Sequence, residues 1–247
     1  MTTPEPGAEP TGATSGLPGW ERTLVVVAHP DDESFGLGGV IDALVTAGSS
    51  VTVLCLTAGE ASTLHTDDEI ELTLVRAAEL ELAAERLGVA STTLLRLPDG
   101  ELDHRIPDLL RAVREAVDVE HPDGLLVFGA GNGVTGHPDH EAATSAALAV
   151  AAERGLPVLE WCLPAAVADV LNAELGAAFA GHDPETLPIM IRVDRGRQRR
   201  AIEAHASQAV PGSVLWRRLD LLGDLEHLRI THPARPLPSH DPGATTP

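Results

Sequence analysis

Short apolar runs alternate along this chain with longer segments whose apolar residues recur at helical spacing. Residues 24–28 (LVVVA) and 51–57 (VTVLCLT) are examples of the apolar runs. Strands that are covered on both faces of a parallel sheet have this uninterrupted apolar character. Parallel neighbours are joined by right-handed crossover helices, so the alternation predicts an α/β fold. We expect a single domain with a Rossmann-like, doubly wound, mostly parallel sheet flanked by helices.

The apolar runs predict six strands and the helical patterns predict five helices. The strands are expected at residues 24–28, 51–57, 92–96, 125–128, 158–162 and 189–193, and the helices at residues 37–47, 68–87, 107–119, 140–154 and 194–205. In such a sheet the first five strands take the order 3-2-1-4-5.

Both ends of the chain differ in composition from the part between them. Residues 1–20 and 233–247 are rich in Pro, Gly and Thr and poor in large apolar side chains. Such segments bury too little apolar surface to offset the entropy of ordering. We therefore predict disordered segments at residues 1–20 and 233–247, with one folded domain at residues 21–232.

The charge balance excludes several classes of partner. The chain has a formal net charge of −20 at pH 7, its basic residues are all Arg, and its aromatic residues are three Trp and three Phe. This balance repels phosphate backbones and anionic lipid surfaces, so we expect no nucleic-acid or membrane partner. There is no apolar run of roughly 20 residues and no secretion signal, which predicts a cytoplasmic protein. A homo-oligomer is compatible with the sequence.

A dense acidic cluster follows the first predicted strand. The loop reads His29-Pro30-Asp31-Asp32-Glu33, and no Lys is present to balance three adjacent carboxylates. Open α/β sheets place their functional sites at the carboxyl ends of the strands. A cation among these carboxylates would relieve their mutual repulsion. The loop therefore indicates a metal site.

A second polar cluster follows the fourth predicted strand. A glycine-rich stretch, residues 129–136, leads into His137-Pro138-Asp139-His140 at the start of a helix. Strands one and four flank the point where the strand order reverses, so the two loops are expected to face each other. His29, Asp32 and His140 would then form a three-ligand site with open positions. Two His and a carboxylate with water are a usual catalytic zinc site, and Fe(II) shares these ligands.

The remaining residues of the two loops suggest a division of roles. Adjacent side chains in a loop tend to point in different directions, so Asp31 is expected to act as general base beside the ligand Asp32. His137 would stabilise an oxyanion, protonate a leaving amine, or only shape the turn. Asp139 is expected to orient a histidine. The alternative for the acids is that they only cap the following helix.

Together the two loops resemble the PIG-L/LmbE family of zinc-dependent N-acetylglucosaminyl deacetylases. Residues 76–80 (RAAEL), 98–100 (PDG) and 204–208 (AHASQ) resemble further segments of that family. The resemblance implies zinc on His29, Asp32 and His140, Asp31 as general base and His137 as transition-state stabiliser.

The resemblance also implies that Arg76 and Asp99 bind sugar hydroxyls. From the residues alone, Arg76 is either a substrate contact or a helix-surface arginine paired with Glu79 or Asp99. We thus expect a hydrolase that removes an acetyl or related acyl group from the nitrogen of an amino sugar or similar small amide. The product would be a free amine.

Three other functions use some of the same residue types. A dinucleotide-binding domain needs its glycines immediately after the strand, where this chain has acids that repel a pyrophosphate. A non-haem iron oxygenase uses the same ligand types, but generally on an antiparallel barrel. A non-catalytic, metal-stabilised domain that binds a small ligand would usually close its metal site with a fourth protein ligand, often Cys. Cys55 and Cys162 instead lie within predicted strands, as buried thiols do.

Overall fold

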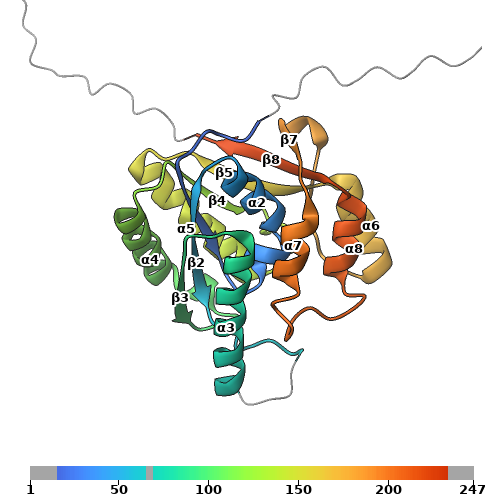
Figure 1. Ribbon diagram of the computed structural model, residues 1–247, viewed down its shortest axis with the longest axis horizontal. Coiled ribbons are helices and arrows are strands. Elements are labelled where there is room, and N and C mark those ends of the chain that lie inside the picture. Colours follow the sequence, from blue (N-terminus) through green and yellow to red (C-terminus); the bar gives the residue numbers. More distant parts are fainter. Residues whose placement is uncertain (1–15, 65–68, 233–247) are drawn as a thin grey trace, which may run out of the picture.

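The computed structural model describes residues 16–64 and 69–232, and Figure 1 shows helices packed on both sides of a central sheet. The described strands are β1 (Arg22–Val27), β2 (Ser50–Thr57), β3 (Ser91–Leu97), β4 (Gly124–Phe128), β5 (Val158–Pro164), β6 (Gly181–His182), β7 (Ile189–Arg192) and β8 (Leu225–Thr231). The described helices are α1 (Asp32–Phe35), α2 (Gly38–Thr46), α3 (Glu69–Leu87), α4 (Ile106–Glu120), α5 (Pro138–Arg154), α6 (Ala165–Leu175), α7 (Arg195–Ile202) and α8 (Val214–Leu222).

The sheet has the order β3-β2-β1-β4-β5-β8-β7, and β6 pairs with the end of β5. Strands β1 to β5 pair with one another in parallel, which confirms the predicted order 3-2-1-4-5. Strand β8 is antiparallel to both β5 and β7, so the sixth predicted strand does not lie next to β5 as a simple continuation would place it. The fold is a mostly parallel α/β sheet flanked by helices, as predicted.

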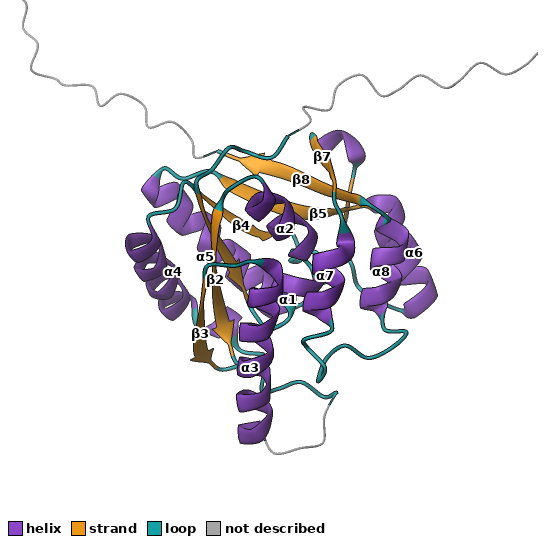
Figure 2. Ribbon diagram, in the orientation of Figure 1, coloured by secondary structure: helices purple, strands orange, loops and turns teal. Residues whose placement is uncertain are grey.

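Helices cover both faces of the sheet (Figure 2), and alternate residues of the same strands belong to two separate cores. On one face, Val25 and Val27 of β1 pack with residues of α2, α3, α6, α7 and α8. On the other face, Leu24 and Val26 pack with residues of α4 and α5. Successive side chains of a strand point to opposite faces, so a strand buried on both faces must be apolar throughout. This double burial explains the uninterrupted apolar runs of the sequence.

The carboxyl ends of β1 and β4 are adjacent in this sheet, since the two strands are paired neighbours. The longer helices that follow them, α2 after β1 and α5 after β4, contribute to opposite cores. The loops between strand and helix therefore diverge above one crevice, as doubly wound sheets require at the point where the strand order reverses.

The predicted disordered segments lie mostly outside the described residues. Residues 1–15 and 233–247 lie outside the described residues, so their predicted disorder stays a prediction. Leu17 and Trp20, which the prediction also included, pack against the core, and the Trp20 ring fills the space beside Gly124. Within the described chain, no helix has both the length and the apolar character needed to cross a membrane.

Candidate metal centre and active site

The loop after β1 has a strained backbone at Asp31. The residue has φ 140° and ψ −25°, a region that favours glycine. Its side chain makes no capping hydrogen bond to α1, whereas the Asp32 carboxylate accepts the backbone N–H of His29 at 2.9 Å. The alternative that these acids only cap the helix is therefore wrong for Asp31. Strain of this kind concentrates at functional sites.

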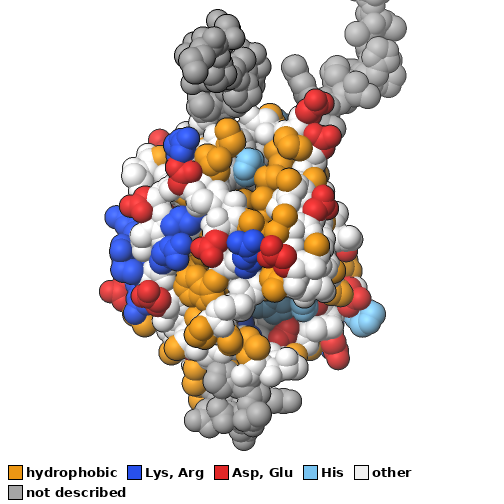
Figure 3. All heavy atoms as spheres, turned by 90° about the vertical axis from the view of Figure 1, so that its right-hand side faces the viewer, with side chains coloured by type: hydrophobic (Ala, Val, Ile, Leu, Met, Phe, Trp, Pro, Cys, Tyr) orange, Lys and Arg blue, Asp and Glu red, His pale blue; other side chains and the backbone are white. Residues whose placement is uncertain are grey.

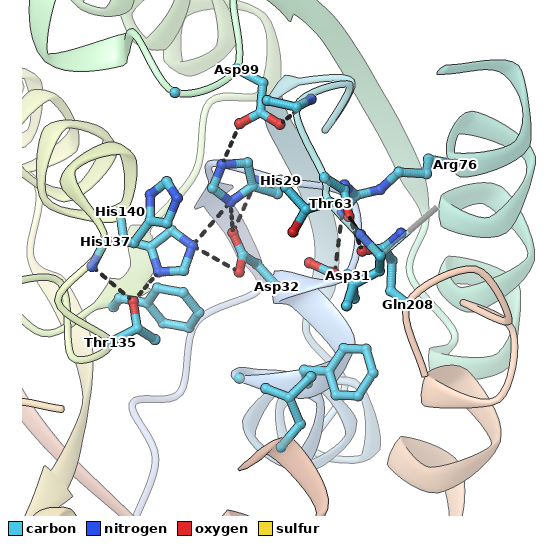
Figure 4. A pocket seen from close by; sticks show the side chains of 18 of the residues that line it. His29, Asp31, Asp32, Thr63, Arg76, Asp99, Thr135, His137, His140 and Gln208 are labelled. Atoms are coloured by element: carbon cyan, nitrogen blue, oxygen red, sulfur yellow. Dashed lines mark hydrogen bonds and ion pairs between the residues drawn. The ribbon is translucent and has the colours of Figure 1, made fainter. Parts of the chain in front are cut away.

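Three donor atoms meet where the two loops face each other (Figure 4). His29 Nδ1 lies 3.0 Å from His140 Nε2, and the Asp32 carboxylate lies 3.1 Å from His140 Nε2 and 3.5 Å from His29 Nδ1. Tetrahedral zinc with nitrogen ligands at 2.0–2.1 Å separates its donor atoms by about 3.3 Å. The donor types and spacing of His29, Asp32 and His140 thus fit a divalent metal.

The surroundings of His29 also favour a cation. Its other nitrogen, Nε2, lies 2.9 Å from Asp99 Oδ1 and 3.4 Å from Asp139 Oδ2. Burial opposes a positive charge here, yet the bonds to Asp139, Asp32 and Asp99 raise the pKa of His29 well above its usual value. Carboxylates behind a ligating histidine fix its ring and strengthen its donor nitrogen. The carboxylates that favour a positive charge on His29 would also favour a metal ion at this position.

His140 is oriented from the glycine-rich loop. Thr135 Oγ1 lies 2.7 Å from His140 Nδ1, which leaves Nε2 directed at His29 and Asp32. Figure 4 shows this contact from the loop to the ring. Sequence reasoning missed Thr135, although it could have been found as the only hydroxyl residue in the loop of residues 129–136.

Asp31 is held by Arg76 of α3. Arg76 Nη2 donates to Asp31 Oδ2 at 3.2 Å and to the Pro30 carbonyl at 2.7 Å, while Nη1 donates to the Gly59 carbonyl at 2.6 Å. Arg76 is 3% exposed, so the alternative of a solvated arginine paired with Glu79 or Asp99 is wrong. Burial raises the pKa of Asp31 to about 6, and the Arg76 charge opposes a larger rise. The carboxylate is therefore mostly ionised at neutral pH, and its pKa is close to the range suited to proton transfer.

His137 ends its loop as the N-cap of α5. Its Nδ1 accepts the backbone N–H of Asp139 at 3.2 Å, so the neutral ring carries its proton on Nε2. Burial, followed by the charges of His29 and His140, lowers the pKa of His137. A ring nitrogen of His137 comes within 4.8 Å of nitrogens of those two histidines. The ring is thus a neutral N–H donor beside the metal ligands.

Asp139 and Asp99 both support His29 from behind. Asp139 is fully buried and accepts the amides of Gly100 at 2.7 Å and Leu102 at 3.0 Å. Although burial works against ionisation, the His29 contact and these amides lower the pKa of Asp139 to about 2. Asp99 contacts His29 through one oxygen and accepts the Ala61 amide at 2.9 Å through the other. Its predicted contact with a sugar therefore competes with two protein partners and stays a prediction.

A buried network behind Asp31 includes residues that the sequence did not assign to the site. Glu33 Oε2 accepts the Asp31 N–H at 3.0 Å, and Glu33 Oε1 lies 2.7 Å from His205 Nε2. Ser207, two residues after His205, donates a hydrogen bond to Glu79 of α3 at 2.6 Å. The segment of residues 205–207 therefore joins α3 to the loop after β1 and holds the strained backbone of Asp31 in place.

The site opens into a cavity of about 380 Å³ lined by both loops, the segment after β2 and residues of α8. Figure 3 shows pale blue histidine and red acidic side chains at a hollow on one face of the molecule. This cavity is lined by the three metal-ligand candidates and also by Asp31, Arg76 and His137. A small molecule can therefore reach the predicted catalytic groups.

Comparison with known proteins identifies the family. A family model described as PIG-L, GlcNAc-PI de-N-acetylase, matches residues 24–151, more than half of the 247 residues. The chain belongs to the PIG-L family. A PIG-L relative from Bacillus anthracis, named as a probable N-acetyl-alpha-D-glucosaminyl L-malate deacetylase 2, is 30% identical over 76% of this chain and 81% of its own length.

A second relative, from Nakamurella multipartita, is named 1D-myo-inositol 2-acetamido-2-deoxy-alpha-D-glucopyranoside deacetylase. It is 29% identical over 78% of this chain and 82% of its own length. The crystal structure of a deacetylase of teicoplanin biosynthesis superposes with a TM-score of 0.63 at 23% identity, over 85% of this chain and 98% of that one. The sequence relatives confirm the expected PIG-L resemblance, and the solved structure confirms the fold.

Proposed function

We propose that this PIG-L protein is a metal-dependent N-deacetylase that acts on a small N-acetylated amino-sugar compound. The observation that carries the proposal is the convergence of His29, Asp32 and His140 next to the Arg76-bound carboxylate of Asp31. Three ligands with open positions and a separate acid-base group are typical of hydrolytic metal sites. The names of the sequence relatives support a deacetylase that acts on N-acetylglucosamine derivatives.

The ligand set fits zinc, with Fe(II) as the alternative. Two imidazoles and one carboxylate suit either ion. When bound, the ion would polarise the amide carbonyl and supply a water that loses its proton near neutral pH. His29, Asp32 and His140 would hold it, while Thr135, Asp99 and Asp139 keep the two rings directed at it.

Asp31 moves the proton. Its carboxylate takes a proton from the attacking water and then gives it to the departing amine nitrogen, because its pKa of about 6 allows both steps near neutral pH. Arg76 fixes Asp31 Oδ2 from one side. The geometry leaves the acid unable to swing toward solvent without breaking this bond.

His137 donates a hydrogen bond to the oxyanion. Because its Nδ1 is occupied by the Asp139 amide, the Nε2–H is the group available to the amide oxygen as negative charge develops there. The ring position at the start of α5 is preorganised by the cap itself. Removal of one such donor typically slows catalysis about 100- to 1000-fold.

The sharpest test compares Asp31→Asn with Asp103→Asn, an exposed acid of the 3-10 turn Leu102–His104. Metal content is measured by elemental analysis, and acetate release is measured on N-acetylglucosaminyl compounds. Asp31→Asn should keep the metal and lose about 100- to 10,000-fold in kcat, because the base is gone. Asp103→Asn should match the wild-type protein. Metal-loaded wild-type protein that releases no acetate or amine from any of these compounds would refute the proposal.

A further inference from the structure

Arg218 of α8 lines the cavity of the proposed active site. Its side chain is 1% exposed, and it lies with Phe35 and Leu215, which line the same cavity. A buried guanidinium beside these apolar side chains requires a physical explanation, because burial of an unpaired charge is strongly unfavourable.

The protein groups around Arg218 do not balance its charge. Nη2 donates to the Phe35 carbonyl, and within the described residues Nε has no hydrogen-bond partner. The guanidinium carbon lies 5.0 Å from the centroid of the Trp161 ring, a cation-π contact. Burial lowers the pKa of Arg218 to about 10, so the side chain still carries its charge at neutral pH.

The nearby carboxylates are already engaged. Both oxygens of buried Glu226 are occupied, one by Arg195 Nη1 at 2.5 Å and the other by Trp161 Nε1 at 2.6 Å. Asp31 is bound to Arg76, and Asp32 contacts the two ligand histidines. Arg218 is therefore the arginine of this cavity whose charge is not matched by an ion pair among the described residues.

We propose that Arg218 binds a carboxylate of the substrate, so that the enzyme acts on amino-sugar amides that carry a negative charge. This inference rests on the proposed deacetylase function. A guanidinium pairs well with a carboxylate, and the apolar neighbours Phe35 and Leu215 strengthen the attraction by excluding water. The net charge of −20 repels anions from the protein as a whole, so a local cation is needed to select one.

The carboxylate has two sources, the group attached to the sugar or the acyl group, and paired substrates distinguish them. One pair is N-acetyl-α-D-glucosaminyl L-malate and its dimethyl ester. The other is N-succinylglucosamine and its methyl ester. The zinc-loaded wild-type enzyme should prefer the acid of one pair by about 10- to 100-fold in kcat/KM, as expected for a charged hydrogen bond.

Arg218→Met should lose this preference for acid over ester, because its side chain is apolar and similar in length. Arg217→Met is the matched control, since Arg217 precedes it in α8 but is exposed and pairs with Glu174. The control should keep the wild-type ratio. Equal rates for acid and ester in the wild-type enzyme, or an unchanged preference in Arg218→Met, would overturn the inference.

A binding measurement separates failure of this inference from failure of the proposed function. Succinate is titrated calorimetrically into the zinc-loaded wild-type, Arg218→Met and Arg217→Met proteins. The wild-type and Arg217→Met proteins should bind it at least about tenfold more tightly than Arg218→Met does. Equal affinity in all three proteins overturns the carboxylate site even if deacetylation is observed. Tighter binding without turnover of any amide supports the carboxylate site and refutes the deacetylase.

Discussion

The strained backbone at Asp31 predicts that glycine stabilises the folded protein at the catalytic position. At φ 140° a side chain is unfavourable, and such strain costs of order 1–3 kcal/mol. Glycine avoids this cost but loses about 0.5–1 kcal/mol relative to alanine through the greater entropy of the unfolded chain. We therefore expect Asp31→Gly to be more stable than Asp31→Ala by about 1 kcal/mol.

The comparison of these two variants isolates the backbone. Both remove the carboxylate, so the loss of the Arg76 contact is common to them and cancels. The assay is thermal and urea unfolding of metal-free protein, because bound metal would add its own stabilisation. For a domain of this size 1 kcal/mol corresponds to about 2–4 °C in Tm. Both variants should be inactive.

An ordinary helical position provides the control. Glu115 is exposed in α4, and there alanine should be more stable than glycine by about 1 kcal/mol. The difference in unfolding free energy between the Gly and Ala variants is therefore expected to have opposite signs at residues 31 and 115. If Asp31→Ala is as stable as Asp31→Gly or more stable, the backbone at Asp31 is not strained and the reasoning fails.

Three further variants test other parts of the site. His140→Ala should abolish stoichiometric metal binding in elemental analysis, whereas the exposed His104→Ala should retain it; equal metal content would exclude the shared site. Thr135→Val removes the contact to His140 Nδ1 and should weaken zinc affinity about 10- to 100-fold in chelator competition. Gly59→Ala would place a methyl group in collision with Arg76 Nη1 at φ +69°, so both Tm and kcat should fall, and full activity would contradict the packing.

Local patterns predicted the parallel part of the sheet and both loops of the site. The runs 24–27 of β1 and 124–128 of β4 are buried and apolar, and helices begin or end at recognisable residues. Strand β8 escaped prediction because it has no apolar run. Its buried position Glu226 carries an ion pair with Arg195, and Arg229 binds Glu160 of β5 at 2.6 Å. Polar residues that are satisfied across strands cannot be recognised as core residues from their sequence alone.

Contacts distant in sequence explain why the roles of individual residues were harder to predict. Asp99 was expected to bind substrate, but the fold places it 2.9 Å from His29, about 70 residues away in the chain. His205 Nε2 lies 2.7 Å from Glu33 Oε1 behind the catalytic loop, although the two residues are 172 positions apart in the chain. Neither contact is indicated by a pattern of neighbouring residues in the sequence.

The sequence by itself determined which chemical groups follow β1 and β4, because strand period and motif spacing are local properties. It also determined the sheet order of the first five strands, since crossover handedness leaves few alternatives. Only the tertiary structure decided which atoms of those groups meet, which carboxylate is held by Arg76, and that Arg218 has no ion pair among the residues that the structure describes. Orientation, burial and charge balance depend on every neighbouring element, and those neighbours are brought together only by folding.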